Sequence, residues 1–360
     1  MLFLGSALVA CGGGTPEVPN DAGISGDGAP GDAGGARTTL ARFEPGPPLL
    51  EARDHHVSFV VVLPDAPYLY VLGGIQNDMT PIVLIERARI EADGTLGPFA
   101  AAGSLPTWTA GGAVAVDGTT IYVFSGLRQS GASATHQPLV DIGSAQTDGS
   151  ITWRAGPPMR GGRAHGGAVV VGRRVYVVGG LDDSFVNNAS AESAEILPNG
   201  DLGAWREEAS LPTTRSHHSL VTDGRRLILT GGLTGDSRVA PALATALAAD
   251  VGSDGVLSAW RDAGSLDTGR ATHSSVYRDG FIYFFGGIDS ADVLASNARA
   301  PLQEDGTLGA FEPTVSWGDG RAHAHQAPSF GAHVYIVAGA TFGAGGHHDS
   351  HSETFVGTFE

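Results

Sequence analysis

The chain has 360 residues and a formal net charge of −17 at pH 7, from 38 acidic residues against 21 basic ones. A charge of this sign argues against a nucleic-acid partner, because phosphate binding requires a basic surface. Hydrophobic residues make up 42% of the chain, which is ample for a core, and 54 glycines with 20 prolines favour short strands and turns over helices. The length fits two average domains or one large all-β domain.

The N-terminus carries an apolar run of ten residues that ends at Cys11, the only cysteine. A single cysteine excludes a disulfide framework and a cysteine-based metal site. The run is too short to span a bilayer, and the stretch from Gly12 to Gly35 is rich in Gly, Pro, Asp and Ala, which is typical of a flexible tether. One alternative is a buried N-terminal strand with an incidental thiol.

The sequence Leu8 to Cys11, "LVAC", resembles the lipobox of a bacterial lipoprotein signal, although the segment lacks the usual basic start. In that family the cysteine is lipidated and becomes the first residue of the mature protein. The resemblance implies a signal segment at 1–10, lipidation of Cys11 and a tether at 11–36. Because Gly12 is not an inner-membrane retention residue of the Asp type, it implies an outer-membrane lipoprotein of the cell envelope.

A repeat covers the rest of the chain. Pairs of small residues follow strand-like apolar runs such as "YLYVLGG", "RVYVVGG" and "FIYFFGG", with spacings of 52 to 55 residues. The pairs are Gly73-Gly74, Ser125-Gly126, Gly179-Gly180, Gly231-Gly232, Gly286-Gly287 and Ala338-Gly339. A second apolar run precedes most of them across a tight turn, often Asp-Gly, which is a strong hairpin signal.

A second hairpin lies later in each repeat, and each of its turns leads into a strand with one aromatic residue. The turns are Asp93-Gly94, Asp148-Gly149, Asn199-Gly200, Asp254-Gly255 and Asp305-Gly306, and the aromatic residues are Phe99, Trp153, Trp205, Trp260 and Phe311. Each repeat therefore predicts four antiparallel strands, and about fifty residues is the size of a propeller blade. The order Arg-x-x-His, apolar strand, turn, "IYVxGG" and aromatic strand resembles the kelch repeat of β-propellers.

The two ends of the chain predict how the ring closes. Six paired small-residue strands are present, but only five complete aromatic hairpins, and the chain ends in the strand "SETFVGTFE". The segment "TTLARFEP", Thr38 to Pro45, supplies the missing strand, with Phe43 in the place of Phe311. The predicted fold class is all-β, a six-bladed β-propeller of four-stranded antiparallel blades over residues 37–360, in which the N-terminal strand completes the last blade and removes the exposed sheet edges.

The loops that enter the innermost strands carry paired Arg and His residues, and in propellers of this type they share the face where function gathers. The candidate ligand-binding residues are Arg53, His56, Arg163, His165, Arg215, His218, Arg270, His273, Arg321 and His325, with His55, His217 and His323 in the same loops. Thr109 and Gly112 replace Arg and His in the second repeat. The pattern suits a carboxylate or an acidic peptide through bidentate pairing. The alternative is a structural framework that bonds neighbouring loops.

A second cluster, "GGHHDSHSE" from Gly345 to Glu353, lies in a loop of the sixth repeat. The candidate metal ligands are His347, His348 and His351, which suit a borderline divalent metal. Their spacing matches no known zinc motif, so a solvated loop tip is the alternative.

Together these patterns predict a monomeric, non-enzymatic recognition module of the cell envelope. It would bind a protein or carbohydrate ligand at the Arg/His face, contact the membrane only through its lipid, and need no cofactor beyond a possible divalent metal. The alternatives are a carbohydrate-active enzyme of the kelch mutarotase kind and a structural envelope spacer. Copper-radical chemistry of the galactose oxidase type is excluded, because its Tyr–Cys crosslink needs a cysteine within the propeller.

Overall fold

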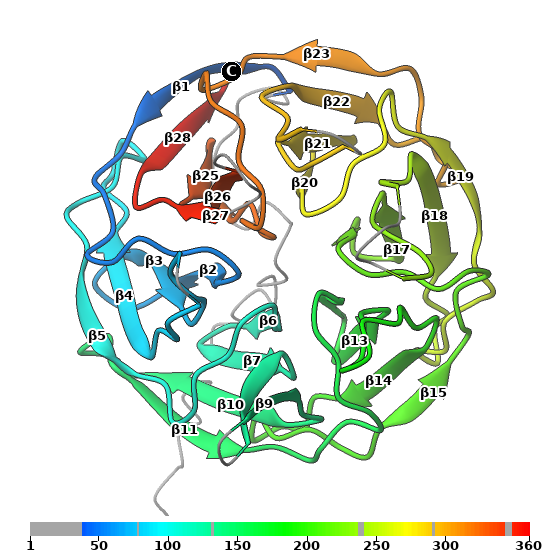
Figure 1. The fold of residues 1–360 in the computed structure, drawn as a ribbon, viewed down its shortest axis with the longest axis horizontal. Helices are drawn as coiled ribbons and strands as arrows, with labels where there is room; N and C mark the ends of the chain where they lie inside the picture. The colour runs from blue at the N-terminus through cyan, green and yellow to red at the C-terminus, as the bar shows by residue number, and fades with distance from the viewer. Residues whose placement is uncertain (1–37, 78, 131–132, 237–240, 290–291, 343–347) are drawn as a thin grey trace, which may run out of the picture.

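The computed structural model describes residues 38–360 except for 78, 131–132, 237–240, 290–291 and 343–347. Cys11, the predicted signal segment and the predicted tether lie outside the described residues. The described chain forms six four-stranded antiparallel sheets that stand around a central axis, which confirms the predicted six-bladed propeller (Figure 1). Within these ranges, no helix has the length and apolar character needed to cross a membrane.

The blades follow one another in chain order, and in each the first strand lies nearest the axis. Blade one contains β2 (Val57–Val62), β3 (Pro67–Leu72), β4 (Leu84–Arg89) and β5 (Ala100–Ser104). Blade two contains β6 (Ala113–Asp117), β7 (Thr120–Phe124), β10 (Val140–Ala145) and β11 (Ile151–Ala155). Blade three contains β12 (Gly167–Val171), β13 (Arg174–Val178), β14 (Ala191–Glu195) and β15 (Arg206–Glu208).

The later blades repeat the same order. Blade four contains β16 (Ser219–Thr222), β17 (Arg226–Thr230), β18 (Thr245–Asp250) and β19 (Arg261–Ser265), and blade five contains β20 (Ser274–Arg278), β21 (Phe281–Phe285), β22 (Asn297–Pro301) and β23 (Glu312–Thr314). Blade six contains β24 (Ser329–Phe330), β25 (His333–Val337), β28 (Thr354–Phe359) and β1 (Leu40–Pro45). Two small hairpins, β8 (Leu127–Ser130) with β9 (Ser133–His136) and β26 (Ala340–Phe342) with β27 (His348–Ser350), extend the loops of blades two and six.

The N-terminal strand closes the ring as predicted. β1 pairs antiparallel with β28, from Leu40 opposite Phe359 to Pro45 opposite Phe355, and the two lie side by side at the ring's outer edge in Figure 1. Phe43 is half-buried and packs edge-on against Trp317, with ring centroids 5.2 Å apart. The missing Asp-Gly turn is therefore the place where the circular arrangement is cut.

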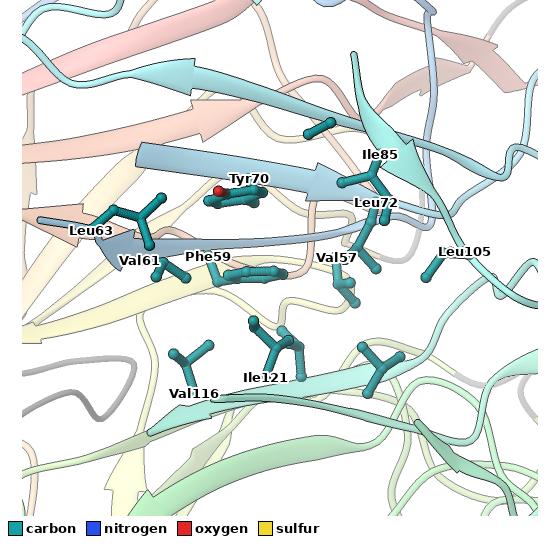
Figure 2. Packing of buried hydrophobic residues seen from close by; sticks show 13 residues of the cluster. Val57, Phe59, Val61, Leu63, Tyr70, Leu72, Ile85, Leu105, Val116 and Ile121 are labelled. Carbon is teal, nitrogen blue, oxygen red and sulfur yellow. The ribbon is translucent and has the colours of Figure 1, made fainter. Parts of the chain in front are cut away.

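The core is divided among the interfaces between blades. Six clusters of buried apolar side chains are present, one between each pair of adjacent blades. In the cluster between blades one and two, the rings of Phe59 and Tyr70 stack with centroids 5.7 Å apart, and Val116 and Ile121 face them from the neighbouring sheet (Figure 2). Strands that are covered on both faces by other sheets explain why their sequences are apolar at consecutive positions.

Two faces of the ring are distinguished by their connections. The loops from the fourth strand of one blade to the first strand of the next, and from the second to the third strand of each blade, lie on one face, called here the loop face. The connections between first and second strands and between third and fourth strands lie on the other, called here the turn face. The first-to-second-strand turns are short, whereas the loop face carries the extensions β8–β9 and β26–β27.

The small-residue pairs mark where neighbouring blades approach most closely. A Cβ atom on Gly179 would lie 2.5 Å from the carbonyl oxygen of Arg215 in the next blade, which is closer than such atoms can come. The second residue of each pair donates its N–H to the same carbonyl of the next blade. These bonds run Gly74 to Thr109, Gly126 to Arg163, Gly180 to Arg215, Gly232 to Arg270, Gly287 to Arg321 and Gly339 to Arg53, at 2.7–3.1 Å. They form a continuous belt of backbone contacts around the ring.

A tyrosine in the second strand of most blades fastens the turn face. Its hydroxyl donates to the carbonyl of the hairpin glycine in the next blade, as Tyr70 to Gly149, Tyr122 to Gly200, Tyr176 to Gly255 and Tyr335 to Gly94. In blade five, Tyr283 donates instead to the carbonyl of Thr38, because the sixth blade has no hairpin turn. In blade four the corresponding residue is Ile228, and Arg226 donates to the carbonyl of Glu304. Thr38 therefore places the start of the described chain on the turn face.

Candidate functional site

A ring of backbone surrounds the mouth of the axis on the loop face. In all six blades, the residue two positions after the arginine position of the repeat (Thr109 in blade two) has a positive φ of 53° to 62°. These residues are His55, Gly111, His165, His217, Thr272 and His323. Positive φ is uncommon for residues other than glycine and marks a strained backbone. The N–H groups of His55, Gly111, His165, His217 and Thr272 each donate to the corresponding carbonyl of the preceding blade at 2.7–3.1 Å.

This backbone geometry gathers five imidazole rings, called here the histidine cluster: His55, His165, His217, His323 and His325. His55 stacks on His323 with ring centroids 4.0 Å apart, and His165 stacks on His217 at 3.9 Å. His325 lies between 5.2 and 6.5 Å from the other four rings. His325 therefore lies beside both stacked pairs.

Three rings of the histidine cluster, those of His165, His217 and His325, favour the neutral form. Burial, and then the neighbouring histidines, hold the pKa values of His165 and His217 well below their usual range. Burial lowers the pKa of His325 to about 3, with His55 as a further cause. A second positive charge about 4 Å from the first would be strongly unfavourable in this surrounding.

One carboxylate faces the histidine cluster. Asp54 is buried and its carboxylate contacts Nδ1 of His55. The hydroxyl of Ser350, from β27, donates to the other oxygen of Asp54 at 2.7 Å. Asp54 therefore joins the seam of blades six and one to the extension of the sixth blade, and it orients the His55 ring through one nitrogen.

The predicted arginines lie inside the loop face. Arg53, Arg163, Arg215, Arg270 and Arg321 are at most 5% exposed. Each of the first four donates to the carbonyl at the end of the second strand of its own blade, as Arg163 does to Gly179 at 3.0 Å. Arg53 also donates to the carboxylate of Glu86, and Arg163 donates to that of Glu192. Arg321 lies 3.7 Å from Glu353. These contacts match the framework alternative, and a ligand-binding role for these residues stays a prediction.

The second blade reaches the same result with a different residue. Thr109 stands at the arginine position, and Arg128 of the β8–β9 extension enters the vacant space. Arg128 is fully buried, donates from Nε to the carbonyl of Ser125 at 2.8 Å and forms an ion pair with Asp141. Ser125 and Asp141 correspond in position to Gly179 and Glu192 of blade three. Sequence inspection missed Arg128, because it lies outside the repeat pattern.

The remaining predicted histidines lie beside the blade interfaces. His56, His218 and His273 are buried, and burial followed by the adjacent arginine lowers the pKa of each to about 3. Nε2 of His273 lies 3.0 Å from the hydroxyl of Thr230 in the preceding blade. A Cβ atom on Gly179 would lie 2.8 Å from the ring of His218. These three residues therefore contribute to packing between blades.

A hollow continues inward from the histidine cluster along the axis. It measures about 500 Å³ with the open solvent it includes. Its walls come from the first strands of blades two to five, from residues just before the strands of blades three and four, and from the segment that leads into blade six. They carry mainly small and polar residues: Ala113, Val114, Gly166, Gly167, Ala168, His218, Ser219, Leu220, Val221, Ser275, His325, Gln326 and Ala327. His325 belongs both to this wall and to the histidine cluster.

Of the three predicted metal ligands, only His351 has a side chain that the structure describes. His347 lies outside the described residues, and for His348 only the backbone, in β27, is described. His351 is occupied within its own loop, with Nε2 2.9 Å from the hydroxyl of Thr341 and Nδ1 3.1 Å from the carboxylate of Glu353. In the described part of the chain, no group of three ligand-type side chains is arranged to hold a metal ion. The metal site therefore stays a prediction.

The loop face also carries most of the exposed large apolar side chains. Of the ten in the described part of the chain, eight lie there: Leu50, Met79, Val83, Leu139, Phe185, Val186, Val315 and Phe342, whereas Val62 and Val256 lie on the turn face. Phe185 and Val186 are 46% and 50% exposed at the tip of one loop. The ring of Phe342 lies 6.2 Å from His323, so one of these apolar side chains lies beside the histidine cluster.

The chain is similar to known proteins in sequence and in fold. No family model matches the chain. It is similar to alpha-scruin of Limulus polyphemus, with 26% identity over 190 residues, which are 52% of this chain and 20% of that protein. It is also similar to beta-scruin of the same organism, with 32% identity over 141 residues, 38% of this chain and 14% of that protein. The chain thus spans a fifth or less of the scruins that it matches.

Among solved structures, that of YjhT superposes with a TM-score of 0.67 and 14% identity, over 86% of this chain and 95% of that one. An identity this low shows the fold alone. The repeat pattern, the six-bladed ring and these similarities support the assignment of the chain to the kelch-repeat family of β-propellers.

Proposed function

We propose that this protein is a lipid-anchored recognition module of the cell envelope that binds a protein partner on its loop face. The observation that carries the proposal is the concentration of exposed apolar side chains on that face, around the histidine cluster. Single exposed apolar residues are normal on any protein, but a group of them on one face indicates an interaction surface. Binding residues also gather on loops that a rigid scaffold holds in place.

The chain direction supports this arrangement. The described chain begins at Thr38 on the turn face, where Tyr283 bonds its carbonyl. A lipid on Cys11 would therefore attach the propeller from the turn-face side and leave the loop face directed away from the membrane. The 26 residues between Cys11 and Thr38 could span at most roughly 90 Å when extended. As the flexible linker that their composition predicts, they would average about 30 Å.

Site-specific photocrosslinking in the native envelope tests the binding face. A photoreactive amino acid replaces Phe185 on the loop face, and a matched variant carries it at Val256 on the turn face, which is similarly exposed at 44%. We expect a discrete protein adduct from the position of Phe185 and none from that of Val256. Adducts of the same size and yield from both positions, or from neither, would contradict a partner-binding loop face.

Metabolic labelling with a palmitate analogue tests the anchor independently. The wild type should be labelled and recovered with the outer membrane, whereas Cys11→Ala should be unlabelled. Equal labelling of both proteins would show that Cys11 is not the lipidation site. The crosslinking result does not depend on this one, because the two experiments address different parts of the chain.

A further inference from the structure

Among the described residues, the outer surface of the loop face carries little positive charge. The loop-face arginines of the described chain are buried in the framework: Arg53, Arg128, Arg163, Arg215, Arg270 and Arg321, all at most 5% exposed. The exception is Arg160, whose side chain is 57% exposed and lies 2.7 Å from Glu207. The guanidinium groups of the six buried residues are turned toward backbone carbonyls and toward carboxylates, which include the exposed side chains of Glu51, Asp267 and Glu353 in the same loops.

The acidic residues of the same loops remain at the surface. They occur in the loops of several blades: Glu51, Asp182, Asp183, Asp236, Asp267, Asp289, Asp292, Asp319, Asp349 and Glu353, all exposed or partly exposed. The outer charge of the loop face is thus set by carboxylates.

The other described arginines lie toward the turn face. Many donate to carbonyls of its turns, as Arg87 does to Asp148, Arg206 to Gly255 and Arg278 to Gly331. The full set is Arg42, Arg87, Arg89, Arg154, Arg173, Arg174, Arg206, Arg225, Arg226, Arg261, Arg278 and Arg299. Charges of both signs are therefore mixed on the turn side, whereas the loop face is acidic, so the net negative charge is unevenly distributed.

Acidic and apolar side chains occur close together on individual loops. Asp182 and Asp183 precede Phe185 and Val186 within one loop, and Oδ1 of Asp182 accepts from the backbone N–H of Val186 at 3.1 Å. The β26–β27 extension also carries both kinds of side chain, although Phe342 and Asp349 occupy successive pairing positions and so point to opposite faces of the hairpin. A partner for such a surface needs apolar side chains and positive charges in close succession.

We propose that the partner of the loop face presents a basic segment in which Arg or Lys residues alternate with apolar residues. This inference rests on the proposed function and adds the chemical class of the partner. Complementary charge would speed the encounter and select against acidic partners, whereas the apolar contacts would hold the complex. Binding should weaken with added salt, because exposed charges are screened.

A direct binding titration tests the class of partner. The probe is a synthetic amphipathic peptide of arginine and leucine, and the controls replace arginine with glutamate or leucine with serine. Removing three loop-face charges in Asp292→Asn/Asp319→Asn/Asp349→Asn should weaken binding of the arginine–leucine peptide about tenfold, since each exposed ion pair contributes modestly. The glutamate peptide should not bind, and the arginine–serine peptide should bind more weakly.

A matched variant separates a specific face from general attraction to an acidic protein. Glu91→Gln/Glu195→Gln/Glu304→Gln removes the same charge from exposed positions on the turn side. Equal weakening by both triple variants, equal binding of the glutamate peptide, or no binding of the arginine–leucine peptide would overturn the inference. If the crosslink from the Phe185 position still forms in that case, the proposed function stands and only the basic class is wrong. Loss of that crosslink as well would remove both.

Discussion

Acidification should destabilise this propeller steeply, because the folded protein keeps several buried histidines in the neutral form. His56, His218, His273 and His325 have pKa values of about 3 in the folded protein, primarily because of burial. In the unfolded chain each should titrate near 6.5. Since the folded pKa is lower, the unfolded state binds more protons below that value. The stability contributed by each neutral histidine is thus complete above about pH 6.5 and is lost as the pH falls toward 3.

The size of the effect follows from the pKa difference. Each such histidine lowers the free energy of unfolding by about 1.4 kcal/mol per pH unit below about pH 6.5. At pH 5 this amounts to about 2 kcal/mol for one residue and about 8 kcal/mol for four. A domain has about 5–15 kcal/mol of stability in total, so unfolding should begin near pH 5. His165 and His217, whose pKa values are also lowered, act in the same direction.

Urea unfolding followed by tryptophan fluorescence, at several pH values between about 7 and 5, measures this dependence. The variant His218→Gln should lose about 2 kcal/mol less than the wild type over this range, whatever its stability at pH 7. Ser219→Ala, at the adjacent wall position, should keep the wild-type dependence. A wild-type free energy of unfolding that changes little between pH 7 and 5, or a His218→Gln variant with the wild-type slope, would refute the reasoning.

Two further predictions concern the framework and use the same unfolding assay at neutral pH. Gly179→Ala should destabilise by several kcal/mol more than Gly172→Ala, because both have positive φ but only the Cβ at 179 would meet backbone, at 2.5 Å; equal losses would contradict the close approach of the blades. Arg128→Ala should lower the free energy of unfolding by about 3 kcal/mol, because Asp141 loses its ion-pair partner. Arg160→Ala, which removes an ion pair at the surface, should lower it by about 0.5 kcal/mol. Similar losses in the two arginine variants would show that Arg128 is not a framework residue.

The six-bladed ring could be predicted from the sequence because each blade repeats the same local sequence pattern. Apolar runs, Asp-Gly turns and Gly pairs recur at a nearly constant period, and a fixed period allows counting of blades. The closing strand followed from counting too, since one aromatic hairpin was missing. The structure adds a physical check at Thr38, whose carbonyl receives the Tyr283 hydroxyl in place of a turn glycine.

The histidine cluster was only partly predictable. His165 and His325 were among the candidates, but the equal role of His55, His217 and His323 depends on a positive φ at one repeat position. Side chains at adjacent positions of an extended segment point in opposite directions. Of two successive residues in one of these loops, one therefore faces the channel and the other faces the blade interface. The available signal was Gly111, because a glycine at the same repeat position indicates left-handed backbone.

The arginines show how the framework determines the character of the binding face. Loop-face carbonyls converge where each second strand ends, and a buried group of that kind must find a donor. Arginine reaches several acceptors at once, and blade two recruits Arg128 from an extension when its repeat position holds Thr109. The sequence shows these residues as a basic rim, but in the structure their guanidinium groups are buried against carbonyls and carboxylates. Among the described residues, the surface of the loop face is therefore left with exposed carboxylates and apolar side chains.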